Sequence, residues 1–254
     1  MARPVAGDAP RPGAEDRAPA ADLRRSGGAR LRPDRAPLTI GRGPRFRAVL
    51  FDWDGTLLDS AESSFRSYCR LFAPYGIDFT REVFARTYAP DWYRTYEGIG
   101  LPREKWKEAD ARWLEIHAEE PCALRPGAAQ ALAKLSAASV LAALVTSGSR
   151  ARVERELALL GVRQAFTQLV CGEDAVRKKP DPEALLLALE RLEVQPGEAA
   201  YVGDSPEDVV MAREARVFAV GLEGGFPNAE ALRAARPDFL ASGLVDAVET
   251  LLRS

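Results

Sequence analysis

The sequence predicts an α/β protein in which a parallel sheet is covered by helices on both faces and a helical insert follows the first strand. Short apolar runs alternate with helical stretches from Arg47 onward, a pattern typical of parallel strands. Residues 62–123 contain no clear strand run and hold most of the aromatic residues. Three of the four apolar runs end in an acid or a hydroxyl residue. Ligands bind beyond the carboxyl ends of such strands, so these polar residues indicate where a site would lie.

Four apolar runs are expected to form strands, and four other stretches are expected to form helices. The strands are predicted at residues 48–51, 140–145, 199–202 and 217–220. The helices are predicted at residues 128–138, 151–160, 182–192 and 206–215. Gly161 ends the second helix, and a proline begins each of the last two, because proline suits the first turn of a helix.

The composition divides the chain into three parts. Residues 1–45 are rich in Ala, Pro, Arg and Gly and contain no aromatic residue. Such a segment buries too little apolar surface to offset the entropy of ordering, so we expect a disordered tail. Residues 46–61 and 124–254 should form the sheet and its helices. Residues 62–123 should form the helical insert, whose aromatic residues indicate a small core and whose position beside the first strand suits a lid.

Composition and charge argue against several classes of function. The chain has 254 residues and a net charge of −2, from 35 basic and 37 acidic residues, which disfavours nucleic-acid binding through bulk electrostatics. No apolar run approaches the ~18 residues of a membrane span. Three cysteines without a CxxC pair and a single histidine, His117, disfavour disulfides, thiolate or multi-histidine metal sites and serine–histidine catalysis. We expect a cytoplasmic protein whose chemistry uses carboxylates, hydroxyls, lysine and arginine.

Two carboxylates lie just past the first predicted strand. Asp52 follows Phe51, and Asp54 begins an Asp-Gly-Thr sequence two positions later. Two like charges so close repel by a few kcal/mol at an effective dielectric of about 20. A divalent cation that prefers hard oxygen ligands, such as Mg²⁺, would relieve this repulsion. An Asp-Gly turn beside an unrelated acid is the alternative interpretation.

Another strand end and one loop carry further candidate groups. Thr146 and Ser147 close the second strand, where hydroxyls and free N–H groups suit phosphoryl oxygens, so we expect Ser147 to contact substrate. Ordinary capping of the next helix is the alternative. Lys178 and Lys179 precede Pro180 in a chain with five lysines and 30 arginines. This scarcity favours a point charge placed for function over an exposed basic loop.

A last pair of acids follows the third predicted strand. Asp204 lies at the strand end and is expected to ligate a metal. Asp208 lies four residues later, where it forms a capping-box pattern with Ser205, although that pattern prefers Glu or Gln. We expect Asp208 either to support the metal through water or to cap the helix.

In this order and spacing, the four motifs resemble those of the haloacid dehalogenase-like hydrolase superfamily. Its pattern is DxDGT, a Thr or Ser at the next strand end, a Lys before Pro, and GDxxxD, and the resemblance runs from about Arg47 to the C-terminus. The insert is similar to the helical cap of the branch that contains phosphoglycolate phosphatases and β-phosphoglucomutase. The resemblance implies a Rossmann-like core, a mobile cap and Mg²⁺ as cofactor.

The resemblance also implies a role for each matched residue. Asp52 would be the nucleophile that forms an aspartyl-phosphate. Asp54 would protonate the leaving oxygen and later deprotonate water. Thr146 and Lys179 would stabilise the transferring phosphoryl group. The Mg²⁺ ligands would be Asp52, the Asp54 carbonyl and Asp204, with Asp208 in support.

These roles predict a Mg²⁺-dependent phosphatase that hydrolyses a small phosphate monoester, with phosphoglycolate as the leading candidate substrate. Dehalogenases of the superfamily lack the second acid, so Asp54 favours phosphate transfer. A sugar-phosphate mutase is disfavoured because its branch carries a cap histidine where this chain has Ser64. A phospho-accepting, receiver-like switch is the alternative from another class, but a receiver has neither the second acid nor the insert.

The insert is where we expect substrate specificity. Arg86 and Arg94 are candidates for pairing with a substrate carboxylate, although each is also typical of a solvated surface arginine. The expected partner is a small phosphorylated metabolite, without nucleic acid or membrane. The sequence leaves the oligomeric state open.

Overall fold

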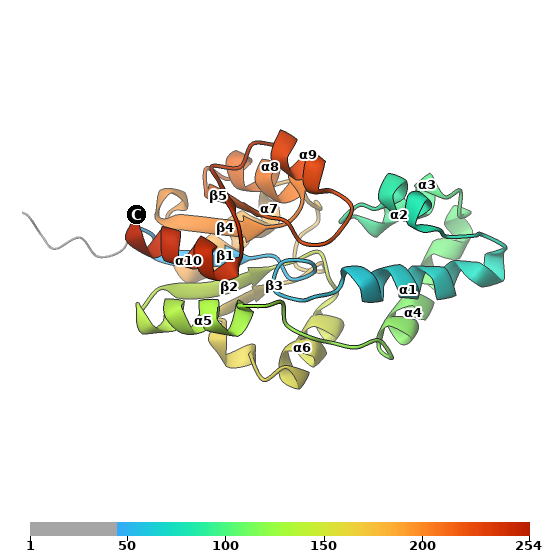
Figure 1. Ribbon diagram of the computed structural model, residues 1–254, viewed down its shortest axis with the longest axis horizontal. Coiled ribbons are helices and arrows are strands. Elements are labelled where there is room, and N and C mark those ends of the chain that lie inside the picture. Colours follow the sequence, from blue (N-terminus) through green and yellow to red (C-terminus); the bar gives the residue numbers. More distant parts are fainter. Residues whose placement is uncertain (1–44) are drawn as a thin grey trace, which may run out of the picture. The chain divides into compact units, whose positions relative to one another are not determined.

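The computed structural model describes residues 45–254, so the predicted tail, apart from Arg45, lies outside the described residues. The described part contains a parallel sheet flanked by helices and a helical insert after the first strand (Figure 1). The predicted α/β class is confirmed. None of the helices in residues 45–254 combines the length and the apolar character needed to cross a membrane.

The sheet has six parallel strands in the order β3-β2-β1-β4-β5-β6. The strands are β1 (Ala48–Phe51), β2 (Leu141–Val145), β3 (Gln168–Val170), β4 (Ala199–Gly203), β5 (Phe218–Leu222) and β6 (Phe239–Ala241). Strand β1 lies between β2 and β4, with Phe51 opposite Leu144 and Val202. The residues that follow these three strands therefore emerge side by side at one edge of the sheet.

The sequence prediction missed the two edge strands. The four predicted strands are confirmed, with ends that differ from the prediction by at most two residues. Strands β3 and β6 have only three residues each, which is too short for an apolar run to be distinguished from a loop. In β6 the middle residue, Leu240, is also exposed.

Helices cover both faces of the sheet. The helices outside the insert are α5 (Ala128–Ala137), α6 (Arg150–Leu159), α7 (Glu183–Leu192), α8 (Pro206–Glu214), α9 (Ala229–Ala234) and α10 (Leu244–Arg253). Short 3₁₀ helices lie at Ala73–Tyr75, Arg103–Lys105, Arg163–Ala165 and Pro196–Glu198. Val49 and Phe51 of β1 pack with α5, α6 and α10, whereas Ala48 and Leu50 pack with α7 and α8. Alternate residues of one strand thus contribute to two core layers.

The insert contains helices joined by short loops. It comprises α1 (Ala61–Phe72), α2 (Arg81–Thr87), α3 (Trp92–Gly98) and α4 (Trp106–His117). Its core is aromatic: Tyr68 stacks on Phe72 with ring centroids 5.5 Å apart, and Phe72 meets Phe79 at 5.0 Å. The aromatic residues pack mainly against one another, and we propose that residues 62–123 form a cap with its own core.

One stacked pair joins the insert to the loop after β5, and one set of hydrogen bonds fixes the chain where it returns from the insert to the sheet. Tyr88, just after α2, stacks on Phe226 from the loop after β5, with ring centroids 4.3 Å apart and an interplanar angle of 9°. Arg125, on the return from the insert, donates hydrogen bonds to the carbonyls of Gly55 and Glu223. The insert and the sheet belong to one compact unit.

We expect the substitution Leu50→Ala to lower the free energy of unfolding by about 2–5 kcal/mol, because Leu50 is fully buried in the central strand. The matched control Leu159→Ala, at a position 71% exposed on α6, should change it by less than about 0.5 kcal/mol. Urea denaturation followed by circular dichroism measures both values. Equal losses in the two variants would contradict the central position of β1.

Candidate active site

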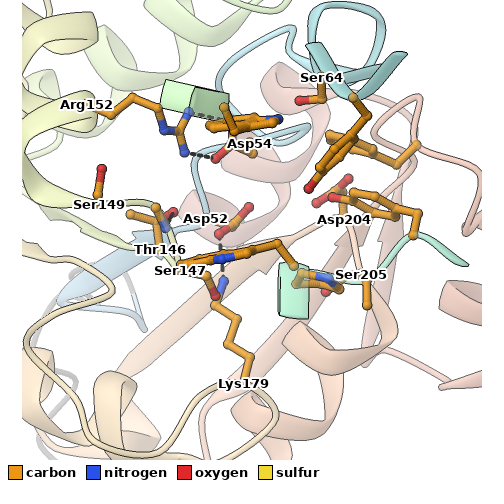
Figure 2. Close-up of a pocket in the computed structure, with 18 of the residues that line it drawn as sticks. Asp52, Asp54, Ser64, Thr146, Ser147, Ser149, Arg152, Lys179, Asp204 and Ser205 are labelled. Atoms are coloured by element: carbon orange, nitrogen blue, oxygen red, sulfur yellow. Dashed lines mark hydrogen bonds and ion pairs between the residues drawn. The ribbon is translucent and has the colours of Figure 1, made fainter. Parts of the chain in front are cut away.

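The candidate residues follow the carboxyl ends of three neighbouring strands. Asp52 follows β1, Thr146 follows β2 and Asp204 follows β4. Figure 2 shows these residues around one pocket that lies between the sheet and the insert. The parallel sheet therefore brings together groups that lie more than 150 positions apart along the chain.

The pocket collects most of the predicted site residues. Seven of them line it: Asp52, Asp54, Thr146, Ser147, Lys179, Asp204 and Asp208. The insert contributes a largely aromatic wall, formed by Tyr68, Tyr88, Trp92, Tyr96 and Trp113. The polar side of the pocket thus comes from the sheet and the apolar side from the insert.

The two predicted specificity residues of the insert do not reach this pocket. Arg86 and Arg94 are exposed and are not among its lining residues, so the expectation that they meet the substrate is corrected here. Their helices turn Phe84 and Tyr96 into the aromatic core, which leaves both arginines on other faces. Helices of seven residues have too little periodicity to reveal this from the sequence.

Lys179 lies at the base of the pocket and joins two of the acids. Its Nζ donates to Asp52 Oδ1 at 2.6 Å, to Asp208 Oδ1 at 2.7 Å and to the hydroxyl of Tyr201 at 2.8 Å. Burial by itself would lower the pKa of Lys179, but the carboxylates of Asp208 and Asp52 outweigh burial and raise this pKa well above its ordinary value. Lys179 is therefore a permanent positive charge beside Asp52.

Asp52 is buried and has one oxygen directed into the pocket region. Lys179 bonds Oδ1, and no donor in the described part of the chain bonds Oδ2. Burial, together with the carboxylates of Asp208 and Asp54, outweighs the lowering effect of Lys179 and raises the pKa of Asp52 to about 7. An unbonded carboxylate oxygen at a strand end is well placed to attack an electrophile.

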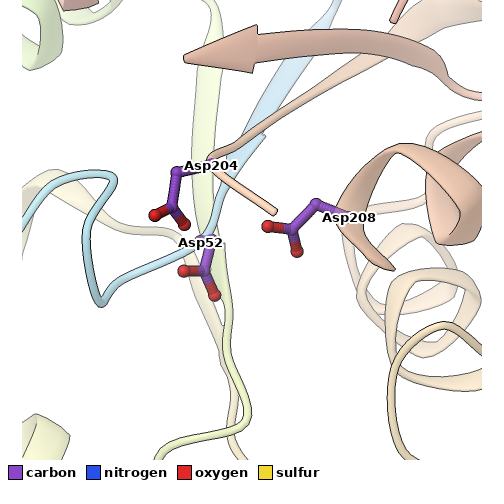
Figure 3. A group of neighbouring side chains, drawn as sticks. All are labelled: Asp52, Asp204 and Asp208. Carbon is purple, nitrogen blue, oxygen red and sulfur yellow. The ribbon is translucent and has the colours of Figure 1, made fainter. Parts of the chain in front are cut away.

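Three buried acids form a cluster that fits a divalent cation. Asp52, Asp204 and Asp208 each offer one carboxylate oxygen, and these oxygens lie within 4.8 Å of one another (Figure 3). Burial and the two neighbouring carboxylates raise the pKa of Asp204 well above its ordinary value. Its Oδ2 is buried without a hydrogen-bond partner, which is costly unless something else pairs with it.

Two glycines leave room beside that oxygen of Asp204. A Cβ at Gly55 would lie 2.3 Å from Asp204 Oδ2, and a Cβ at Gly224 would lie 2.1 Å from the same atom. Side chains at these two positions would fill the space beside the unpaired oxygen. The all-oxygen donor set, the unpaired atom and this space together fit a hard divalent metal ion.

Asp208 is held in place through both of its carboxylate oxygens. Oδ2 accepts hydrogen bonds from the backbone N–H and the hydroxyl of Ser205, at 3.0 and 2.8 Å, and completes a capping box at the start of α8. Oδ1 accepts from Lys179 and Tyr201. With both oxygens engaged, Asp208 suits a supporting role better than direct metal binding, and we propose that role.

Asp54 is paired with an arginine that the sequence analysis did not identify. Arg152 Nη1 donates to Asp54 Oδ1 at 3.0 Å, and Nη2 donates to Oδ2 (Figure 2). Arg152 is buried in the first turn of α6. Burial would raise the pKa of Asp54, but the guanidinium outweighs burial and lowers it. One sequence signal was available: Arg152 and Glu156 are spaced i, i+4 on the same face as the apolar Val153 and Leu157.

Hydroxyl groups line the loop after β2. Thr146 is buried, and its Oγ1 accepts from the N–H of Gly148 at 3.0 Å, which leaves the hydroxyl proton free to bond a ligand. Ser149 precedes α6 but makes no side-chain cap, and its buried Oγ has no hydrogen-bond partner. Ser147 also lines the pocket. These hydroxyls offer donors to an oxyanion.

His117 ends α4 of the insert and is buried behind the pocket, where it faces Glu156 of α6. Its Nδ1 lies 3.1 Å from Ser67 Oγ, and its ring stacks on Trp113 with centroids 4.4 Å apart. Its Nε2 lies 3.8 Å from Glu156 Oε1. The histidine is not among the residues that line the main pocket, so its effect is on stability.

The parallel sheet, the helical insert after β1 and the buried acids beyond the strand ends form an arrangement that suits a hydrolase. Residues 49–222 match the haloacid dehalogenase-like hydrolase family. The chain belongs to this family, and the resemblance predicted from the motifs is confirmed.

Named relatives are similar to most of the chain. Pyrophosphatase PpaX of Bacillus velezensis is 32% identical over 206 residues, which cover 80% of this chain and 94% of that protein. Phosphoglycolate phosphatase of Yersinia pseudotuberculosis is 30% identical over 210 residues, 79% of this chain and 90% of that protein. The crystal structure of CbbY from Rhodobacter sphaeroides in complex with phosphate matches with a TM-score of 0.69 and 26% identity, over 82% of this chain and all of that one.

We expect His117 to make the protein less stable in acid. Burial, together with the charges of Arg152 and Arg155, outweighs the carboxylate of Asp54 and lowers the pKa of His117 from 6.5 to about 4. The unfolded chain thus binds a proton near pH 6.5 and the folded protein only near pH 4. The free energy of unfolding therefore falls as the pH decreases, by about 2–3 kcal/mol between pH 7 and pH 4.5.

The substitution His117→Gln should remove this part of the acid sensitivity. Urea unfolding of the wild type and the variant at pH 7 and pH 4.5 gives the difference in their free energies of unfolding at each pH. That difference should shift in favour of the variant at pH 4.5. A difference that is the same at both pH values would contradict the neutral, buried state of His117.

Proposed function

We propose that the protein is a Mg²⁺-dependent phosphatase that hydrolyses a small phosphate monoester through an aspartyl-phosphate on Asp52. The observation that carries this proposal is the buried contact between Lys179 and Asp52, beside Asp204 with its unpaired oxygen. A fixed cation, a free carboxylate oxygen and an incomplete metal site are the groups that phosphoryl transfer requires. Family membership and the names of the relatives support the same reaction class.

The first step transfers the phosphoryl group to Asp52. Its Oδ2 forms a bond to phosphorus as the ester P–O bond breaks, and Asp54 gives a proton to the leaving oxygen. Asp54 holds that proton only when its ion pair with Arg152 is loosened, because the guanidinium lowers its pKa. Lys179 holds Asp52 Oδ1 and stabilises the negative charge that spreads over the phosphoryl oxygens. The products of this step are an alcohol and an acyl phosphate on the carboxylate.

The second step regenerates the enzyme. Asp54, now ionised, takes a proton from water, and the oxygen of that water bonds to phosphorus as the bond to Asp52 breaks. Inorganic phosphate leaves, and Asp54 is again protonated for the next cycle. Thr146 donates its free hydroxyl proton to a phosphoryl oxygen, and Ser147 and Ser149 supply further donors on the same loop.

Mg²⁺ fits the acid cluster and would be held by Asp52, the Asp54 carbonyl and Asp204, with Asp208 in support. When bound, it supplies positive charge that offsets the repulsion between the carboxylates and an incoming phosphate. Among the described residues, the unpaired oxygen of Asp204 is a buried group that such a cation would pair with.

Phosphoglycolate is the leading candidate substrate. Relatives named phosphoglycolate phosphatase and pyrophosphatase are 30–32% identical to this chain, and both names denote small anionic phosphate compounds. A mutase would need a group that acts at a second phosphorylation site of its substrate. The mutase branch has a histidine at the position that Ser64 occupies in this chain, which disfavours a mutase. A receiver-like switch would keep its phosphoryl group, whereas Asp54 favours its release to water.

Asp52→Asn should lower the rate of phosphate release at least about 10³-fold, because an amide cannot form the acyl phosphate. The fold should be retained, since the two side chains are nearly the same size. The control Asp59→Asn removes an exposed acid from the same segment and should keep the wild-type rate. Release of phosphate from p-nitrophenyl phosphate and phosphoglycolate measures this.

Two results would contradict the proposal. Retained turnover in Asp52→Asn would remove the nucleophile assignment. A wild type that keeps a phosphoryl group on Asp52 and releases no phosphate would favour the switch.

Mg²⁺ should stabilise the metal-free protein. At a concentration 100 times Kd the gain is about 2.7 kcal/mol, or roughly 5–10 °C in Tm for a chain of this size. Asp204→Asn should lose most of this shift, and Asp59→Asn should keep it. Thermal unfolding after chelation, with and without Mg²⁺, tests this independently of activity. The absence of any Mg²⁺ effect on Tm, combined with activity that resists chelation, would contradict a metal at this cluster.

A further inference from the structure

Arg152 is a charged group in the pocket that the reaction steps above leave without a role. Of the described residues that line the pocket, only Arg152 and Lys179 are positively charged. Lys179 is held at the base by Asp52 and Asp208. Arg152 lies toward the insert, with its guanidinium 5.7 Å from the ring of Trp113. Arg152 is therefore the cation placed to meet the part of a substrate that lies beyond its phosphoryl group.

The pairing of Arg152 with Asp54 must change during the reaction. Both oxygens of Asp54 accept from the two terminal nitrogens of Arg152. Asp54 acts on the leaving oxygen only if one of its oxygens turns toward that atom. Glu156 bonds only Nη1 of Arg152, so Nη2 lacks an acceptor once Asp54 turns away from it, and a buried donor without an acceptor is unfavourable. A replacement acceptor is best supplied by the substrate.

Glu156 keeps Arg152 in position during such an exchange. Its two oxygens lie 3.3 and 3.2 Å from Arg152 Nη1, and its Oε2 also accepts from Trp53 Nε1 at 2.7 Å. Glu156 and Trp53 are both buried. Gly148 provides the space, because a Cβ there would lie 2.4 Å from Arg152 Nη2. The guanidinium is thus anchored on one side, and its contact with Asp54 is the one left to vary.

We propose that Arg152 binds a second anionic group of the substrate, so that the site selects phosphate compounds whose leaving group is itself anionic. A carboxylate or phosphate a few bonds from the bridging oxygen lies beside Asp54, because Asp54 acts on that oxygen. This group accepts the hydrogen bonds that Asp54 gives up, in the paired geometry that suits arginine. The exchange makes and breaks hydrogen bonds only. The inference rests on the proposed function and defines its substrate class.

The test compares two esters that differ in one charge. Phosphoglycolate carries a carboxylate on its leaving group, and 2-hydroxyethyl phosphate carries a neutral hydroxymethyl group at the same position. The measured quantity is the ratio of kcat/KM for the first ester to kcat/KM for the second. We expect this ratio to be well above 1 in the wild type and to fall about 10- to 100-fold in Arg152→Met, as for the loss of a hydrogen-bonded charge pair.

Matched variants separate recognition from folding. Arg155→Met removes a positive charge from the same helix, at an exposed side chain 3.9 Å from Glu156 Oε1, and should leave the ratio within about twofold of the wild type. Arg152→Lys keeps the charge but loses the paired geometry, so its ratio should lie between those of the wild type and Arg152→Met. If Arg152→Met does not fold because Glu156 is left unpaired, the double variant Arg152→Met/Glu156→Gln removes both charges and gives the same readout.

A binding measurement removes the dependence on turnover. In the Asp52→Asn background, calorimetry in the presence of Mg²⁺ gives Kd for each ester without hydrolysis. Adding Arg152→Met to this background should weaken phosphoglycolate binding at least about tenfold more than 2-hydroxyethyl phosphate binding. A purely structural role for Arg152 would weaken both to the same degree.

The outcomes distinguish this inference from the proposed function. A wild type that releases no phosphate from either ester, from pyrophosphate or from p-nitrophenyl phosphate would overturn the proposed function, and the inference with it. An active wild type without preference for phosphoglycolate would overturn only the inference. An equal loss for both esters in Arg152→Met would also overturn it, because Arg152 would then only position Asp54.

Discussion

The site depends on placing several carboxylates at one edge of the sheet with too few cations to neutralise them all. Lys179 is shared between Asp52 and Asp208, which joins the end of β1 to the start of α8. No basic side chain of the described residues forms an ion pair with Asp204 within 4 Å. The resulting repulsion is the physical reason to propose a metal at this position, because one divalent ion would supply the charge that two side chains do not. The proposed metal site thus rests on the charge balance as well as on the geometry.

A second shared cation organises the side of the pocket nearer the insert. Arg152 is divided between Asp54 and Glu156, so two acids again compete for one positive charge. The two pairs differ in one respect: Lys179 lies at the base, whereas Arg152 lies between the sheet and the insert, close to Trp113. A shared cation adapts to a new anion because exchanging one carboxylate for another keeps its charge satisfied. Because Arg152 is the shared cation that lies nearer the insert, Arg152 rather than Lys179 suits recognition of a variable group.

The sequence allowed the site residues at the carboxyl ends of the strands to be predicted, but not which faces of the helices are buried. Asp52 and Asp204 were assigned because each follows an apolar run, and the carboxyl ends of parallel strands meet by topology alone. The edge strands were missed because three residues carry too little pattern. Arg152 was missed because an arginine in an amphipathic helix is typically solvated, and only tertiary packing shows that its face is buried. Arg86 and Arg94 were expected to meet the substrate but lie outside the pocket, because a location in the insert does not show which way a side chain points.

The insert and the sheet contribute different properties to the pocket. The wall formed by the insert is aromatic, and its one acid there, Asp110, accepts hydrogen bonds from Trp92 and Tyr93. The basic group that faces this wall belongs to the sheet side, at the first turn of α6. An aromatic wall excludes water and strengthens the electrostatic interactions inside. Discrimination by charge is then set by Arg152 on the sheet side of the pocket and made stronger by the insert, so a substrate is selected by where its charges lie as much as by its shape.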